Sequence, residues 1–225
     1  MASQGENLPL GLMVPPVAAG SEIPPEPPDV AGRTLAVAAR LLCGATTFFF
    51  LAFLFAYIYL RSLNQNGLWR PPHEHPNQGW GAAFVACVVI SAIASIVAGR
   101  QMKAKSPAWV ASALGALVLG LAAVAVQCIE YTVQNFGPTD GAYASVFCGW
   151  SAFYLLAVLG AMFWLETHVA SARRARARIG RGEPPPTGDI KEPARTISPG
   201  MDAAIFYWTF LAGIGVITYV TLYLV

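Results

Sequence analysis

A polar motif interrupts the apolar stretches near the middle of this chain, in the segment VQCIEYTVQNFGPTDGAYASVF at 126–147. Gln127 and Glu130 are three residues apart, so on a helix they share one face, and Tyr131 follows directly. A carboxylate on an apolar helix is costly unless it has a hydrogen-bond partner. We therefore expect Gln127 and Glu130 to contact a neighbouring helix, another subunit or a lipid headgroup. The alternative is an ordinary Glu at a helix end that faces water.

The three histidines are the first candidates for a redox metal site, because bilayer-embedded haem and copper centres need His, Cys or Met ligands that converge. His73 and His75 lie in the polar loop PPHEHPNQ, and His168 lies at the end of an apolar segment. No histidine falls in the interior of an apolar segment. We expect this chain itself to bind no haem, metal or other cofactor, and HEH to be polar loop rather than a weak metal site.

The cysteines and the remaining motifs point to no catalytic centre. Cys43, Cys87, Cys128 and Cys148 fall in or beside four different apolar segments without a C-x-x-C pair. We expect small buried side chains rather than disulfides or cluster ligands. Nucleophile elbows, phosphate-binding glycine loops and paired catalytic carboxylates are absent from the sequence. The sequence therefore predicts no active site in this chain.

Five apolar segments must position these residues. Of 225 residues, 56% are hydrophobic and 12% charged, and the mean hydropathy is +0.52, whereas soluble domains are about 25% charged. Asp, Glu, Lys and Arg are absent from 41–60, 79–99, 106–129, 141–165 and 203–225. Each stretch has the roughly 20 residues that cross a bilayer core. We predict an all-α integral membrane protein, a bundle of five transmembrane helices at about 35–61, 79–100, 106–132, 141–168 and 202–225.

The basic residues predict an orientation. Twelve of the 14 Lys and Arg precede the first charge-free stretch or lie between the second and third or the fourth and fifth stretches. The positive-inside rule then puts the N-terminus inside and the C-terminus outside. Residues 1–32 form a Pro-rich extramembrane tail, 33–225 form the membrane domain, and 169–201 form a cytoplasmic loop. The RRARAR run in that loop favours anionic lipid over nucleic acid, because it follows a membrane helix directly.

Several short motifs recur in a fixed order along the chain. They are ATTFFFLAFLFAYIYLR in the first predicted helix, WRPP after it, Q-x-x-E-Y in the third, YASVFCGWSAFYLLAV in the fourth and YWTFLAGIGVITYVTLY in the fifth. In this order and spacing they resemble the subunit III family of haem-copper oxidases, the third large subunit of cytochrome c oxidase. The resemblance runs through four of the five predicted helices and one loop.

The chain also departs from the pattern of that family. Thr46 stands where the family has a membrane-embedded Glu, Tyr154 and Ala157 replace two histidines, and Thr209 replaces a third. The family's two additional N-terminal helices are absent. The chain is therefore identified as a divergent five-helix member that retains the helical scaffold.

The resemblance implies a supporting function. Subunit III of these oxidases holds no redox centre, packs on the catalytic subunit I, encloses phospholipid and helps to sustain proton uptake, while haem and copper lie in the partner subunits. It implies a multi-pass protein of the cell (inner) membrane, with other oxidase subunits and lipids as partners. The candidate lipid or subunit contacts are Gln127, Glu130, Tyr131, Tyr57, Thr46 and Tyr154. Near the outer ends of the helices, Tyr57, Trp69, Trp80 and Tyr131 are expected to anchor at the membrane interface.

Two alternatives remain open at this stage. One is an accessory subunit of a related respiratory complex, such as nitric oxide reductase or a supercomplex, since a family scaffold does not fix which enzyme it serves. The other is a small stand-alone transporter. A transporter would need a polar pathway, for which the sequence offers only Glu130, Gln127 and scattered hydroxyls.

Overall fold

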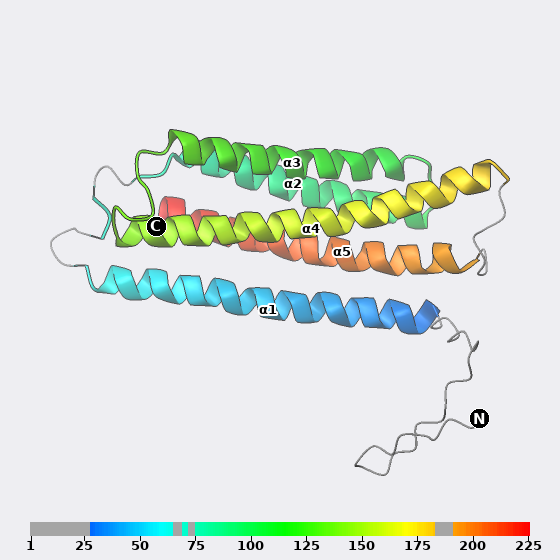
Figure 1. Cartoon of the computed structure of the whole chain (residues 1–225), viewed down its shortest axis with the longest axis horizontal. Coiled ribbons are helices and arrows are strands. Elements are labelled where there is room, and N and C mark those ends of the chain that lie inside the picture. The colour runs from blue at the N-terminus through cyan, green and yellow to red at the C-terminus, as the bar shows by residue number, and fades with distance from the viewer. Residues whose placement is uncertain (1–27, 65–68, 72–74, 183–190) are drawn as a thin grey trace, which may run out of the picture.

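The computed structural model describes residues 28–64, 69–71, 75–182 and 191–225, and these residues form helices and short connections without any strand (Figure 1). The elements are α1 (Pro28–Ser62), α2 (Gln78–Lys103), α3 (Trp109–Val133), α4 (Ala142–Gly180), α5 (Lys191–Tyr219) and a closing π-helical turn, η1 (Val220–Leu224). All five α-helices of the described residues are long and apolar enough to cross a membrane. The prediction of an all-helical, multi-pass membrane fold is confirmed for these residues, and the orientation of the termini stays a prediction.

The helices run side by side in alternating directions (Figure 1). At one end of the bundle, which we call the C-terminal end, α1, α3 and η1 finish while α2 and α4 begin. The helix α5 packs against α1, α2 and α4, whereas α2 has its most extensive contact with α3. The helix α1 packs on α4 and α5 and carries a row of exposed apolar side chains that includes Leu41, Phe48 and Phe55.

Small side chains at heptad spacing bring α2 and α3 together. The buried positions of α3 recur at steps of three and four residues: Trp109, Ala113, Ala116, Gly120, Ala123, Gln127 and Glu130. The helix α2 repeats the pattern with Gly81, Phe84, Val88, Ser91, Ser95 and Ala98. Small residues at such positions let two helix backbones approach closely. The approach is close enough for the Ser91 hydroxyl to donate to the Ala116 carbonyl across 2.6 Å.

Aromatic rings fill the core towards the C-terminal end. Trp69, in the connection after α1, lies edge-on to Tyr57 and to Tyr143, with ring centroids 5.2 and 5.8 Å apart. Tyr57 is 3% exposed and Trp69 7%. The prediction that these two rings anchor at the membrane interface is therefore wrong: both pack inside the bundle, because α4 supplies an aromatic partner beside them.

The helices α1, α4 and α5 extend well beyond the bounds that the sequence predicted. The helix α4 continues to Gly180, and α5 already begins at Lys191, so much of the predicted 169–201 loop is helical. Ala and Arg, which dominate 170–178, are strong helix formers and no Gly or Pro interrupts them before Gly180. Pro199 lies inside α5 and is tolerated there. Residues 28–32, which were predicted to belong to the extramembrane tail, form the start of α1. Residues 1–27 of that tail lie outside the described residues.

Candidate functional site

The buried carboxylate of Glu130 is the centre of the candidate site. Gln127 and Glu130 are the last two members of the buried heptad stripe of α3, and each is 1% exposed. The small residues earlier in that stripe hold α3 against α2, so the same face carries Glu130 into the bundle. The alternative of a Glu that faces water does not hold in the structure.

Two neutral donors satisfy this carboxylate. The Tyr223 hydroxyl lies 2.9 Å from Oε1 and 2.8 Å from Oε2 of Glu130, and its single proton serves both oxygens. Gln127 donates from Nε2 to Oε2 across 2.9 Å. The expected contact with a neighbouring helix is thus made with the C-terminal turn of the chain. This contact ties α3 to the end of α5, since Tyr223 belongs to η1.

The backbone around Tyr223 is arranged to admit its ring. The turn η1 is π-helical, with the Val225 amide donating to the Val220 carbonyl, and such turns are frequent at functional sites. Gly81 of α2 faces the ring, and a Cβ there would overlap it. The Gln78 side chain donates from Nε2 to the Tyr223 carbonyl across 3.3 Å. The ring stacks on Tyr219 and meets Phe147 edge-on, with centroids 5.3 and 5.4 Å apart.

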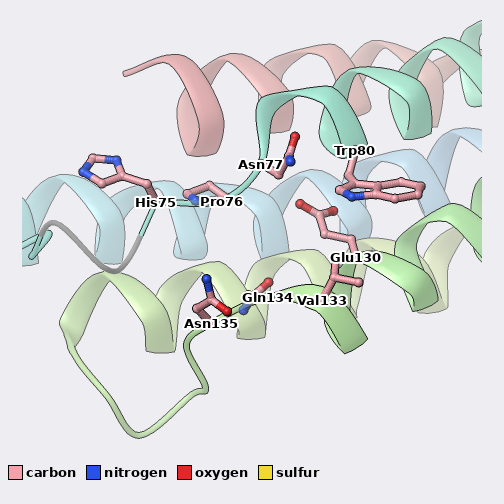
Figure 2. A pocket seen from close by; sticks show the side chains of 8 residues that line it. All are labelled: His75, Pro76, Asn77, Trp80, Glu130, Val133, Gln134 and Asn135. Atoms are coloured by element: carbon pink, nitrogen blue, oxygen red, sulfur yellow. The ribbon is translucent and has the colours of Figure 1, made fainter.

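A cavity of about 360 Å³ opens beside the carboxylate at the C-terminal end. Its lining comes from the segment before α2, the first turn of α2 and the end of α3: His75, Pro76, Asn77, Trp80, Glu130, Val133, Gln134 and Asn135. Figure 2 shows Glu130 projecting from α3 toward Trp80 and Asn77. Gln134 donates from Nε2 to the Phe136 carbonyl across 2.9 Å, and its Oε1 is buried without a hydrogen-bond partner.

The other predicted contact residues are spread through the bundle. Thr46 shares a 3.0 Å hydrogen bond with the Tyr207 hydroxyl, and Tyr154 donates to the Leu211 carbonyl across 2.8 Å. Tyr131 donates to Ser151 across 2.8 Å. Of the six candidates, only Gln127 and Glu130 contact each other through hydrogen bonds. Thr46, Tyr57 and Tyr154 are buried inside this chain. The hydroxyls of Thr46 and Tyr154 bond to α5, whereas the Tyr57 hydroxyl accepts from Arg61 on its own helix.

The histidines and cysteines lie apart. Trp164 donates from Nε1 to Nε2 of His168 on the same helix, His75 lines the cavity, and His73 lies outside the described residues. No three His, Cys, Asp or Glu side chains of the described residues are grouped so as to hold a metal ion. That this chain binds no cofactor stays a prediction. All four cysteines are unpaired. The expectation of burial holds only in part, because Cys43, Cys87 and Cys148 are half-buried, and it is wrong for Cys128, which is exposed.

Sequence reasoning missed Tyr223, Gly81 and Trp80 as parts of this site. The sequence did contain a signal that Glu130 points into the bundle. The small residues Ala and Gly recur at heptad spacing along α3, and Gln127 and Glu130 continue that series on the same face. No such signal existed for Tyr223, which is 93 residues away in the chain and reaches the carboxylate only through the π-helical turn.

No protein-family model matches the chain, and no curated protein matches it.

Proposed function

We propose that this chain is a non-catalytic subunit, of the subunit III type, of a haem-copper terminal oxidase of the cytochrome c oxidase class. It packs on the catalytic subunit, holds lipid at its flank and stabilises the complex during aerobic electron transport in the cell (inner) membrane. The haem and copper belong to the partner subunits, and this chain supplies helices.

One observation carries the proposal: the motif residues from separate helices meet in one buried core. Tyr57 of the first motif contacts Trp69 of WRPP, which contacts Tyr143. Tyr143 in turn donates to the Leu222 carbonyl. The next residue, Tyr223, donates to Glu130 of the Q-x-x-E-Y motif. Motif residues that pack on one another define a scaffold, and they support a structural role for it.

The lipid-facing surface fits a subunit that shares a membrane with larger partners. Phe48 is 77% exposed and Phe55 70%, both on α1. Because α1 packs mainly along α4 and α5, a broad apolar face of this helix is left for lipid or another subunit. The apolar surface alone does not choose between them, so the proposal is tested on the complex.

The experiment is gentle detergent purification of the tagged chain from its native membrane. An optical haem spectrum and identification of the co-purifying chains come first. We expect haem-containing catalytic subunits of an oxidase in the eluate. Catalytic subunits of nitric oxide reductase would favour the accessory alternative, and a haem-free eluate without partner chains would contradict both.

Selective removal of this chain tests the supporting role. The depleted complex should keep its haem spectrum and start with substantial oxygen consumption, then lose activity during turnover faster than the intact complex. Haem that leaves with this chain would refute the non-catalytic role. Identical time courses for intact and depleted complex would refute the protective role.

A further inference from the structure

The last turns of α4 carry arginines that have no acidic partner in the described part of the chain. The segment VASARRARAR, which ends at Arg178, contains four arginines and no acidic residue. Arg173, Arg174 and Arg178 are exposed, and none of them forms an ion pair with another described residue. At the same end of the bundle, Lys103 of α2 does have such a partner, because it pairs with Asp202 across 2.9 Å. We call the three exposed arginines of α4 the arginine face.

The arginine face reaches the outer limit of the headgroup layer. From Ala142 to Ala172 the helix α4 measures about 46 Å at 1.5 Å per residue. A bilayer with its headgroups is about 40–45 Å thick. The arginines follow this stretch, and α4 continues to Gly180, past the end of α2 and the start of α3 (Figure 1). The arginine face is therefore accessible to an anionic group in water as well as to lipid headgroups.

An acidic segment of the same chain enters at this end of the bundle. The helix α1 begins where α4 ends, and the two helices pack on each other (Figure 1). Residues 1–27, which precede α1, contain Glu6, Glu22 and Glu26 but no Lys, Arg or His. Glu22 is six residues before Pro28, and six residues span up to ~20 Å. Because the axes of packed helices are about 8–10 Å apart, Glu22 and Glu26 are within reach of α4.

The connector from α4 to α5 does not supply the missing negative charge. Residues 179–201 contain as many basic as acidic residues, three of each: Arg181, Lys191, Arg195, Glu183, Asp189 and Glu192. The connector is therefore neutral as a whole. The segment before α1, in contrast, brings only acidic side chains.

We propose that residues 1–27 dock on the arginine face of α4 through Glu22 and Glu26. A guanidinium group and a carboxylate form two parallel charge-assisted hydrogen bonds. An exposed ion pair of this kind is weak between separate molecules. Here the segment is covalently joined to α1, so its effective concentration beside α4 is in the millimolar range. The docked segment links α1 to α4 beyond the membrane core, whichever complex the chain joins.

Carbodiimide cross-linking of the purified full-length chain in phosphatidylcholine nanodiscs tests the proposal. The variant Arg178→Lys keeps the positive charge and supplies an amine, which a carbodiimide joins to a contacting carboxylate as an amide. The matched control is Arg100→Lys, which places an exposed amine near the end of α2, at the same end of the bundle. Mass spectrometry of the digested chain identifies the joined peptides. A mixture of labelled and unlabelled chains separates links within one chain from links between two.

We expect amides that join position 178 to Glu22 or Glu26 within one chain. Their yield should exceed that of the Arg100→Lys control by about tenfold, because docking holds the carboxylates at α4. In ~1 M salt, where charges are screened beyond about 3 Å, the yield should fall about fivefold. Both results together support docking of residues 1–27 on the arginine face.

Four outcomes would overturn the proposal, and three of them identify another occupant. Amides to Glu183 or Asp189 in place of the tail would assign the arginine face to the connector. Amides found only between labelled and unlabelled chains would assign it to a second copy. Loss of the amides when phosphatidylglycerol replaces part of the phosphatidylcholine would assign it to anionic lipid. Equal yields from Arg178→Lys and Arg100→Lys would show that the tail does not select α4.

Discussion

The hydroxyl of Tyr223 gives the sharpest test of the structure. Tyr223→Phe removes one oxygen and leaves the ring, so the contacts with Tyr219 and Phe147 persist. The loss is the hydrogen bond to a carboxylate that is 1% exposed. A hydrogen bond to a charged group contributes about 1.5–3 kcal/mol. We therefore expect the free energy of unfolding to fall by about 2 kcal/mol, a change of roughly thirtyfold in the unfolding equilibrium constant.

The assay is equilibrium unfolding of the purified chain in mixed micelles, followed by circular dichroism. Tyr219→Phe is the matched control, one helical turn earlier, and should change stability by no more than about 0.5 kcal/mol. In a Glu130→Leu background the partner is gone, so Tyr223→Phe should then cost at most about 0.5 kcal/mol. Equal effects of Tyr223→Phe and Tyr219→Phe in the wild-type background would refute a stabilising hydrogen bond between Tyr223 and Glu130.

Two further predictions address packing and topology. Gly81→Ala should destabilise the chain by about 1–3 kcal/mol in the same unfolding assay, because the added Cβ overlaps the ring of Tyr223. The control Gly115→Ala, whose Cβ meets nothing within 4 Å, should be neutral or stabilise the chain by up to ~1 kcal/mol. A larger loss of stability in Gly115→Ala than in Gly81→Ala would contradict the close approach of α2 to η1. In a variant without the native cysteines, Val225→Cys should react with an impermeant thiol reagent on intact cells, while Thr187→Cys stays protected. The reason is that the positive-inside rule places the loop with the basic residues, which includes Thr187, in the cytoplasm. Labelling of Thr187→Cys but not of Val225→Cys would reverse the proposed orientation.

The amino-acid sequence alone determined the number and class of the helices. Stretches of about 20 apolar residues without charge have one stable solution in a bilayer, because every backbone group must find its partner within the segment. The sequence also singled out Gln127 and Glu130 as a pair on one face. Both inferences are local: they need only the composition of a segment and the helical period.

Local reasoning failed where the outcome depended on a neighbouring segment. Tyr57 and Trp69 have the amphipathic rings of interface anchors, yet Tyr143 and the rest of the aromatic core bury them. The predicted end of α4 was too early for a different reason. The arginines after residue 172 end the apolar segment, but arginine is a strong helix former, so the helix continues beyond that segment.

Only the tertiary structure decided what Glu130 does. Its partner Tyr223 lies 93 residues away, and a π-helical turn, a glycine on α2 and the heptad contact of α2 with α3 must all be in place before the two side chains meet. The cavity likewise exists only where the start of α2 meets the end of α3. A sequence specifies each of these residues, but the free energy that brings Glu130 and Tyr223 together comes from packing between helices that are far apart in the chain.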